Sequence, residues 1–157
     1  MTRACATPML TEATSNTSYY RNTSMLSQLQ APANNRKALS GPALRSFFSI
    51  AEHWQLSIDE QMTLLGVTAR STFFKWKKDN EALLSKDTLE RISYILGIYQ
   101  ALQLLLPNQS AADEWLRKAN QAPLFGGHSA LERMLSGNVA DLYVVRHYLD
   151  AQRNGWA

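Results

Sequence analysis

The 157-residue sequence has few of the residues that cross-link small proteins or bind metals. Cys5 is its only cysteine, which excludes a disulfide framework within the chain and a cysteine-rich zinc site. Its three histidines, His53, His128 and His147, are far apart in sequence and show no metal-ligand spacing. We therefore expect no metal site and no cofactor.

Long hydrophobic runs are also missing. No segment approaches the roughly 18–20 apolar residues that cross a membrane, and the N-terminal segment MTRACATPML lacks the apolar core of a signal peptide. These absences predict a soluble, cytoplasmic protein with no membrane partner. Sustained alternation of polar and apolar residues is absent as well, so the chain is predicted to be all-α.

An excess of positive charge is confined to the N-terminal tail. The formal net charge is +3, and residues 1–40 carry all of it, with four basic side chains against one acidic. Residues 41–107 hold seven basic and seven acidic side chains, and residues 108–157 hold five of each. The net charge alone is therefore no argument for a nucleic-acid partner, and the local distribution of charge has to decide.

The composition divides the chain into three parts. Residues 1–39 are rich in Thr, Ser, Asn and Gln, which is typical of a flexible tail, although residues 19–29 have enough apolar content for a short helix on a partner. Residues 40–107 are predicted to fold as a helical bundle whose last helix, apolar almost all round, is the spine that joins two halves and could also form a dimer surface. Residues 108–157 are predicted to form a second, small α-helical domain.

Several residues mark helix ends. Pro42 fits the first turn of a helix, and Ser57–Glu60 reads as a capping box that opens another. Gly66 suits the left-handed end of that helix, and Thr68 is placed to cap the next. Ser85, Asn108 and Asn138 are predicted caps further along the chain, and Ser129-Ala-Leu-Glu132 reads as a second capping box.

The segment from Gln61 to Lys78 has no acidic side chain but four basic ones, within a predicted helix-turn-helix. Helical spacing places Phe73 and Trp76 on the packed face and leaves a polar face for a DNA major groove. The candidate DNA-binding residues are Thr68, Arg70, Ser71, Thr72, Phe74, Lys75, Lys77 and Lys78.

Their expected roles differ. Thr68 and the helix N-terminus suit a phosphate, Arg70 and Ser71 lie early enough to reach base edges, and the late lysines suit phosphates. Phe74 could meet a thymine methyl group or belong to an interface. Because one small domain rarely gives enough specificity, we expect a homodimer that reads two half-sites of operator DNA.

Two segments resemble a known family. The run from Leu64 to Trp76, LLGVTARSTFFKW, resembles an Xre-type helix-turn-helix. The segment from Trp115 to Gly137, with its Trp-Leu, Phe-Gly-Gly and Ser-x-Leu-Glu elements in order, resembles the MbcA/ParS/Xre antitoxin toxin-binding domain. Together the two cover residues from about 45 to 157.

The resemblance implies a non-enzymatic antitoxin of a RES-type toxin, a toxin whose fold resembles ADP-ribosyltransferases and whose substrate is NAD. It implies that the C-terminal domain covers the active site of the toxin and that the protein represses its own operon. On the last helix the candidate toxin-binding residues are Arg146, Tyr148, Leu149, Arg153, Asn154 and Trp156. Trp156 has a second interpretation, in which it packs against the core of its own chain.

Two other functions are weighed against the antitoxin. A catalytic site would have to use His128, Glu132 and the Gly126-Gly127 loop, but the glycines follow no strand and no nucleophile–base pair is evident, so no enzyme is predicted. The alternative is a dimeric, ligand-sensing transcriptional repressor in which residues 108–157 hold a small molecule.

Overall fold

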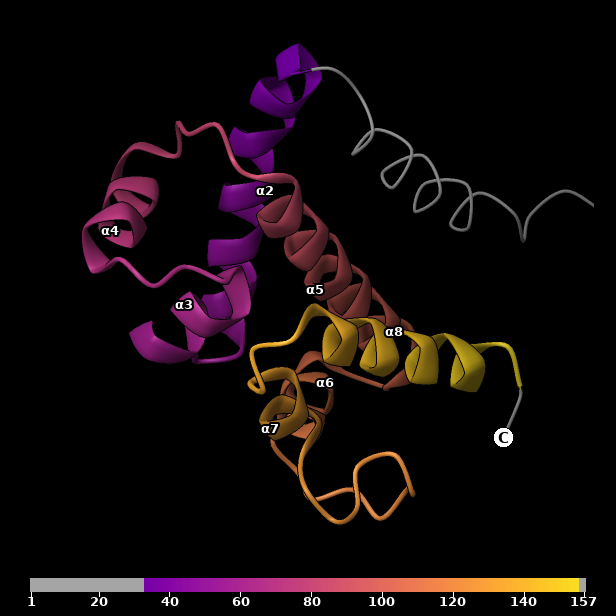
Figure 1. Ribbon diagram of the computed structural model, residues 1–157. Coiled ribbons are helices and arrows are strands. Elements are labelled where there is room, and N and C mark those ends of the chain that lie inside the picture. Colours follow the sequence, from indigo (N-terminus) through magenta and orange to yellow (C-terminus); the bar gives the residue numbers. More distant parts are fainter. Residues whose placement is uncertain (1–32, 156–157) are drawn as a thin grey trace, which may run out of the picture.

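In the computed structural model of the chain, residues 33–155 are described. This part consists of seven helices and an isolated antiparallel bridge between Ala119 and Ser129, without strands, which confirms the all-α prediction (Figure 1). The possible helix at residues 19–29 and the side chain of Trp156 lie outside the described residues. The helices are α2 (Ala33–His53), α3 (Ile58–Leu65), α4 (Arg70–Asp79), α5 (Lys86–Leu105), α6 (Gln109–Trp115), α7 (Ala130–Met134) and α8 (Val139–Arg153).

Helix α2 begins earlier than the sequence indicated. Pro42 lies inside the helix, so the prediction that it occupies the first turn is wrong. Buried Ser40 contributes to the reason: its hydroxyl donates to the Arg36 carbonyl at 2.6 Å and accepts the Leu84 backbone N–H at 3.1 Å. These bonds hold the turn before the proline in helical form against the segment that leads into α5.

Most of the predicted helix ends are confirmed. Ser57 and Glu60 form a capping box at α3, and Gly66 ends that helix at φ 70°. Ser85 caps α5 by accepting the Thr88 N–H. Asn108 caps α6 by accepting the Ala111 N–H. The second capping box, Ser129 with Glu132, opens α7.

Two predicted caps differ. Ala69, not Thr68, holds the N-cap position of α4, and no side chain caps that helix. Asn138 is at the N-cap of α8, but its side chain makes no capping bond. Instead the Ser136 hydroxyl accepts the Asn138 N–H at 3.1 Å and donates to Asp141 at 2.6 Å. A neighbouring side chain has replaced the expected cap of α8.

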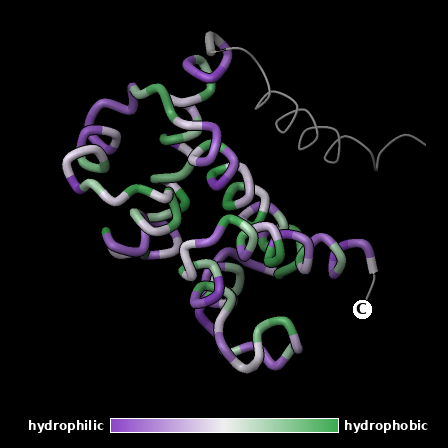
Figure 2. Tube along the Cα trace, in the orientation of Figure 1, coloured by the Kyte–Doolittle hydropathy of each residue, from purple (hydrophilic) through white to green (hydrophobic). Residues whose placement is uncertain are grey.

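Helix α5 is the spine of the molecule, as predicted. It packs against α2 and α3, which precede it in the chain, and against α6 and α8, which follow it. Helix α5 makes most of its contacts with α8 and α2, and hydrophobic residues are seen in the interior of the molecule in Figure 2. Ile92, Ile95, Ile98 and Leu102 are fully buried there, whereas Leu104 is exposed near the C-terminal end of α5. One continuous helix thus contributes to both halves of the core.

Candidate functional site

Helix α4 lies at the edge of the molecule and is held by few contacts (Figure 1). Phe73 is its one buried side chain, and Trp76 is half-buried beside it. The Phe73 ring meets the ring of Phe48 of α2 edge-on, with centroids 5.8 Å apart. The predicted packed face of the second helix of the helix-turn-helix is therefore confirmed, and the rest of α4 faces outward.

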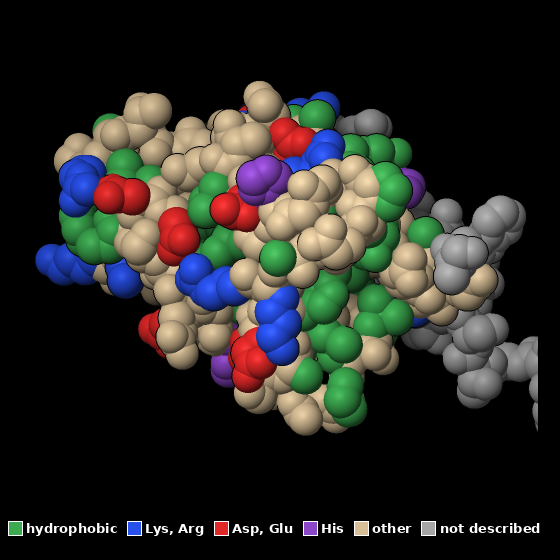
Figure 3. Space-filling view, turned by 90° about the horizontal axis from the view of Figure 1, so that it is seen from below, with side chains coloured by type: hydrophobic (Ala, Val, Ile, Leu, Met, Phe, Trp, Pro, Cys, Tyr) green, Lys and Arg blue, Asp and Glu red, His purple; other side chains and the backbone are tan. Residues whose placement is uncertain are grey.

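The predicted DNA-binding residues lie together along this outward side and in the turn before it. Figure 3 shows Lys and Arg side chains at the end of the molecule where α4 lies. Among the predicted residues, Thr72 is half-buried and the rest are exposed, namely Thr68, Arg70, Ser71, Phe74, Lys75, Lys77 and Lys78. Because no side chain caps α4, its first N–H groups are not taken up by a cap and suit an anion.

Arg70 has a partner that sequence reasoning missed. Its guanidinium Nη2 lies 2.6 Å from a carboxylate oxygen of Asp59 in the first turn of α3, and both side chains are largely exposed. An exposed pair of this kind contributes little to stability. It does hold the guanidinium at the N-terminal end of α4. No sequence signal singled out Asp59, since the two residues are brought together only by the turn between the helices.

The last helix differs from its prediction. Arg146 and Leu149 were expected to contact a toxin, but both are buried within this chain. Arg146 Nε lies 2.8 Å from Asp150 Oδ2, and its guanidinium lies across Gly97 of α5. A Cβ built at Gly97 would clash with the Arg146 guanidinium, so any side chain at this position would displace the arginine from its place. Arg146 and Leu149 therefore lie beneath the surface that a partner could reach.

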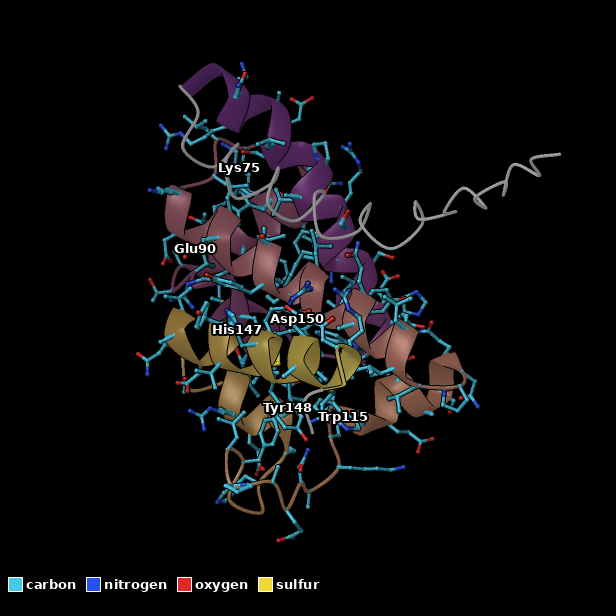
Figure 4. The ribbon with its side chains drawn as sticks, turned by 90° about the vertical axis from the view of Figure 1, so that its right-hand side faces the viewer. Lys75, Glu90, Trp115, His147, Tyr148 and Asp150 are labelled. Atoms are coloured by element: carbon cyan, nitrogen blue, oxygen red, sulfur yellow. The ribbon has the colours of Figure 1, made fainter. Side chains whose placement is uncertain are left out.

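Among the described residues, the other predicted positions of this helix are at least partly accessible. Tyr148 is half-buried, stacked on Trp115 at a centroid distance of 6.4 Å and edge-on to Phe125 at 5.1 Å. Figure 4 shows Tyr148 and Trp115 together beneath α8, at the opposite end of the molecule from Lys75. Arg153 is half-buried and Asn154 is exposed. These residues, and not the buried pair, mark the accessible end of α8.

An aromatic cluster between α5 and α8 was not predicted. Tyr143 is 45% exposed and contacts Tyr94 edge-on at 5.8 Å and His147 at 4.2 Å, measured between ring centroids. Partial burial raises the pKa of the Tyr94 hydroxyl, and the carboxylate of Glu90 beside it raises that pKa further. The spacing of 143 and 147 on one helix face is the signal that could have found this cluster.

A further contact joins the two halves. Arg117, just after α6, donates to the backbone carbonyls of Trp54 at 3.0 Å and Gln55 at 3.1 Å. Its other guanidinium nitrogen lies 3.6 Å from the capping-box carboxylate of Glu60. The arginine therefore links the C-terminal end of α2 and the first turn of α3 to the C-terminal half of the molecule.

The pair formed by His128 and Glu132 has a structural role. The backbone N–H of Ser129 donates to Glu132 at 2.7 Å, which is the main reason that the pKa of this carboxyl lies below its ordinary value. A carboxylate engaged in a helix cap is not free to act as a base. Between residues 33 and 155 no cluster of three His, Cys, Asp or Glu side chains could hold a metal ion, and no helix is long and apolar enough to cross a membrane.

Comparison with known families decides what the two halves are. Residues 33–97 match the family described as the antitoxin Xre-like helix-turn-helix domain, and residues 101–155 match the antitoxin Xre/MbcA/ParS C-terminal toxin-binding domain. The chain belongs to the Xre/MbcA/ParS antitoxins. It is also similar to a protein of Sinorhizobium fredii named "Uncharacterized protein y4oB", at 53% identity over 112 residues, which are 71% of this chain and 84% of the relative.

This family assignment settles the general character of the protein. It is an antitoxin of a toxin–antitoxin system, with a helix-turn-helix domain followed by a toxin-binding domain. Both domain families are non-enzymatic, so the expectation that this antitoxin is not an enzyme is confirmed. The helix-turn-helix match begins at residue 33, where α2 begins. It therefore includes residues 33–39, which the composition had placed in the flexible tail. The C-terminal match to a toxin-binding domain favours the antitoxin over the ligand-sensing repressor.

Proposed function

We propose that this antitoxin neutralises a RES-type, NAD-consuming toxin with its C-terminal domain and represses its own operon through α4. The DNA-binding half of the proposal is carried by one observation. The second helix of the helix-turn-helix presents its basic side chains outward while Phe73 anchors it from behind. A helix that is apolar behind and basic in front fits the major groove of DNA.

In the proposed complex, the two ends of α4 have different tasks. Arg70 and Ser71, in the first turn, reach base edges, and Lys75 reaches either a base edge or a phosphate. Lys77 and Lys78, in the last turn, bind phosphates, as does Thr68 with the uncapped N–H groups. Thr72 is half-buried and supports the helix more than it contacts DNA.

Two substitutions test the DNA-binding half in gel-shift titrations on the promoter DNA of the antitoxin's own gene and on a scrambled duplex. Lys75→Ala should weaken binding and lower the slope of log affinity against log salt by about 0.9 if it removes one phosphate contact. Arg70→Ala should also reduce the preference for promoter over scrambled DNA. Lys118→Ala, an exposed lysine of the other domain, is the control. Unchanged affinity in both variants would refute the proposal.

The toxin-binding half is supported by the family match of residues 101–155 and by the accessible last turn of α8. In the proposed complex Tyr148, Arg153, Asn154 and Trp156 contact the toxin and cover its active site. Arginines and large aromatic side chains often dominate protein interfaces, and a guanidinium suits a pocket that binds a phosphate-bearing dinucleotide.

Truncation tests this half of the proposal. Ending the chain after Asp150 removes the accessible turn but keeps the Arg146–Asp150 ion pair and the buried residues of α8. This variant should lose neutralisation when it is co-expressed with the product of the adjacent gene, while promoter binding persists. Trp156→Ala isolates the contribution of Trp156. Equal loss of neutralisation and DNA binding would indicate misfolding, whereas full neutralisation by the truncated chain would contradict the proposed toxin contacts.

We also propose that the antitoxin is a homodimer that reads two half-sites, because a single helix-turn-helix gives limited specificity. Light scattering should then give a mass near twice the 17.7 kDa of one chain. A monomeric mass with full operator affinity would contradict this. An operator partner places the proposed site of action in the cytoplasm.

A further inference from the structure

One exposed side chain of α4 is not explained by a basic surface. Phe74 is 46% exposed in the middle of the helix. Across residues 33–155, it shares this property with only three other large hydrophobic residues, Leu83, Leu104 and Tyr143, none of which lies on α4. Keeping an aromatic ring in water has a free-energy cost that is recovered when apolar surface covers the ring.

The ring of Phe74 packs against a buried aromatic ring. It meets the buried ring of Phe73 edge-on, with centroids 5.5 Å apart and planes at 75°. Phe73 in turn meets Phe48, and Phe48 meets Phe47 in the core of the helical bundle. Phe74 is thus the outermost member of a row of four aromatic rings that begins inside the protein, and α4 presents it in a defined direction.

The surroundings of Phe74 are basic. Arg70 lies four residues before it and Lys78 four residues after it, so all three share one face of the helix. The nearby carboxylates are those of Asp59, which is paired with Arg70, and of Asp79 at the C-terminal end of the helix. Lys77 Nζ lies 6.0 Å from the ring of Phe48, toward α2, and leaves the outer face of Phe74 open.

An apolar group within a basic face fits a particular feature of DNA. In the major groove thymine presents a 5-methyl group, and apolar side chains such as phenylalanine contact it. Four residues of helix span about 6 Å, and base pairs are stacked about 3.4 Å apart. A contact made by Phe74 would therefore fall one or two base steps from a contact made by Arg70.

We propose that Phe74 recognises the 5-methyl group of a thymine in each half-site of the operator. This inference rests on the proposed function, in which α4 enters the major groove. The charge around Phe74 favours DNA over a second copy of the chain. In a symmetric dimer formed through this face, Arg70, Lys75 and Lys78 of one copy would meet the same cations of the other, and like charges in contact oppose association.

The experiment removes a single methyl group. Thymines in the promoter duplex are replaced by deoxyuridine one position at a time, which preserves base pairing and the phosphate backbone. For the full-length wild-type chain, deoxyuridine at one position in each half-site should lower affinity about fourfold. This is the effect of no longer burying one methyl-sized group. Phe74→Ala should bind the thymine duplex more weakly and show no further loss with deoxyuridine at that position.

Two variants separate this effect from general weakening. Lys75→Ala should bind both duplexes more weakly and keep the wild-type ratio between thymine and deoxyuridine. Phe74→Leu, which retains an apolar side chain, should keep part of that ratio. Because Phe74 is half-exposed, its variants should unfold at nearly the wild-type temperature, and circular dichroism checks this.

Each contrary result has a separate meaning. If wild-type affinity is the same with thymine and deoxyuridine at every position, DNA binding stands and the assignment of Phe74 is wrong. If Phe74→Ala keeps the deoxyuridine effect, or instead converts a dimer to a monomer, the ring belongs to another contact and the inference is overturned. Failure of the wild-type chain to bind promoter DNA would overturn the proposed function and this inference with it.

Discussion

Helices α4 and α8 both carry predicted functional residues, but they are attached to the protein in different ways. Helix α4 buries only Phe73 and turns its polar side chains to the solvent. Helix α8 buries Leu142, Val145, Arg146 and Leu149 against the rest of the chain. A charged side chain on a helix is therefore not evidence of an exposed surface until the packing of that helix is known.

The difference between the helices depends on what lies opposite them. Where α8 crosses α5, Gly97 has no side chain, and the Arg146 guanidinium fills the space that a side chain would occupy. Arg146 Nη1 and Asp150 Oδ1 are buried there without a hydrogen-bond partner. The crossing thus combines close packing with a polar pair that is only partly satisfied, which makes it sensitive to substitution.

The largest effect is expected from filling the space at Gly97. Gly97→Leu should displace Arg146 and separate α8 from α5, lowering the free energy of unfolding by about 3 kcal/mol or more. Urea denaturation followed by circular dichroism measures this, and hydrogen exchange should show the amides of α8 losing protection first. Gln100→Leu, an exposed position on the same helix, should stay within about 0.5 kcal/mol of wild type. A Gly97→Leu protein as stable as wild type would show that α8 does not depend on this crossing.

A smaller effect is expected when one member of the ion pair is removed. Arg146→Met leaves the carboxylate of Asp150 without its partner and should cost about 2 kcal/mol, less than a fully enclosed pair because the Asp150 side chain is 28% exposed. The double variant Arg146→Met/Asp150→Leu should recover most of that loss. Denaturation of both single variants and the double variant completes the cycle. Strictly additive losses would mean that the two side chains act independently.

The smallest effects are expected from removing a capping-box serine in each of the two domains. Ser57→Ala and Ser129→Ala each remove the serine oxygen of a capping box and should each cost about 1 kcal/mol. Hydrogen exchange should locate the first loss in α3 and the second in α7. Losses of protection spread equally over both domains would contradict two locally acting caps.

The cap at Ser129 also predicts a dependence on pH. The pKa of Glu132 is lowered, chiefly by the backbone N–H of Ser129. A lowered pKa means that the carboxylate stabilises the fold above the pKa of the unfolded chain, and that this contribution is lost as the pH falls through the folded value. Glu132→Gln should therefore make the free energy of unfolding depend less on pH below about pH 5. An unchanged acid profile would exclude a role for the charge.

Local signals in the sequence were enough to predict much of the fold. Both capping boxes, the glycine end of α3 and the opposite faces of Phe73 and Phe74 depend on residues close in sequence, and the structure agrees. The error at Pro42 is different, because the turn before it is held by a hydrogen bond from the backbone N–H of Leu84, far along the chain, to the Ser40 hydroxyl.

The C-terminal surface was harder to predict for the same reason. The burial of Arg146 depends on Gly97, a residue of another helix that reads as an ordinary position in an apolar run. The contact of Arg117 with the carbonyls of Trp54 and Gln55 has no sequence signature, because every residue has a carbonyl. Contacts of this kind become visible only when the helices are placed in space.

The continuity of α5 has a geometric consequence. The two family matches end and begin at residues 97 and 101, within the helix Lys86–Leu105, so a stiff helical rod takes the place of an interdomain linker. A partner bound at the C-terminal end is consequently held at a fixed rotation relative to α4. Inserting a single residue into this rod would turn one end against the other by about 100°. The antitoxin thus fixes the angle of rotation between a partner bound at one end of α5 and a partner bound at the other.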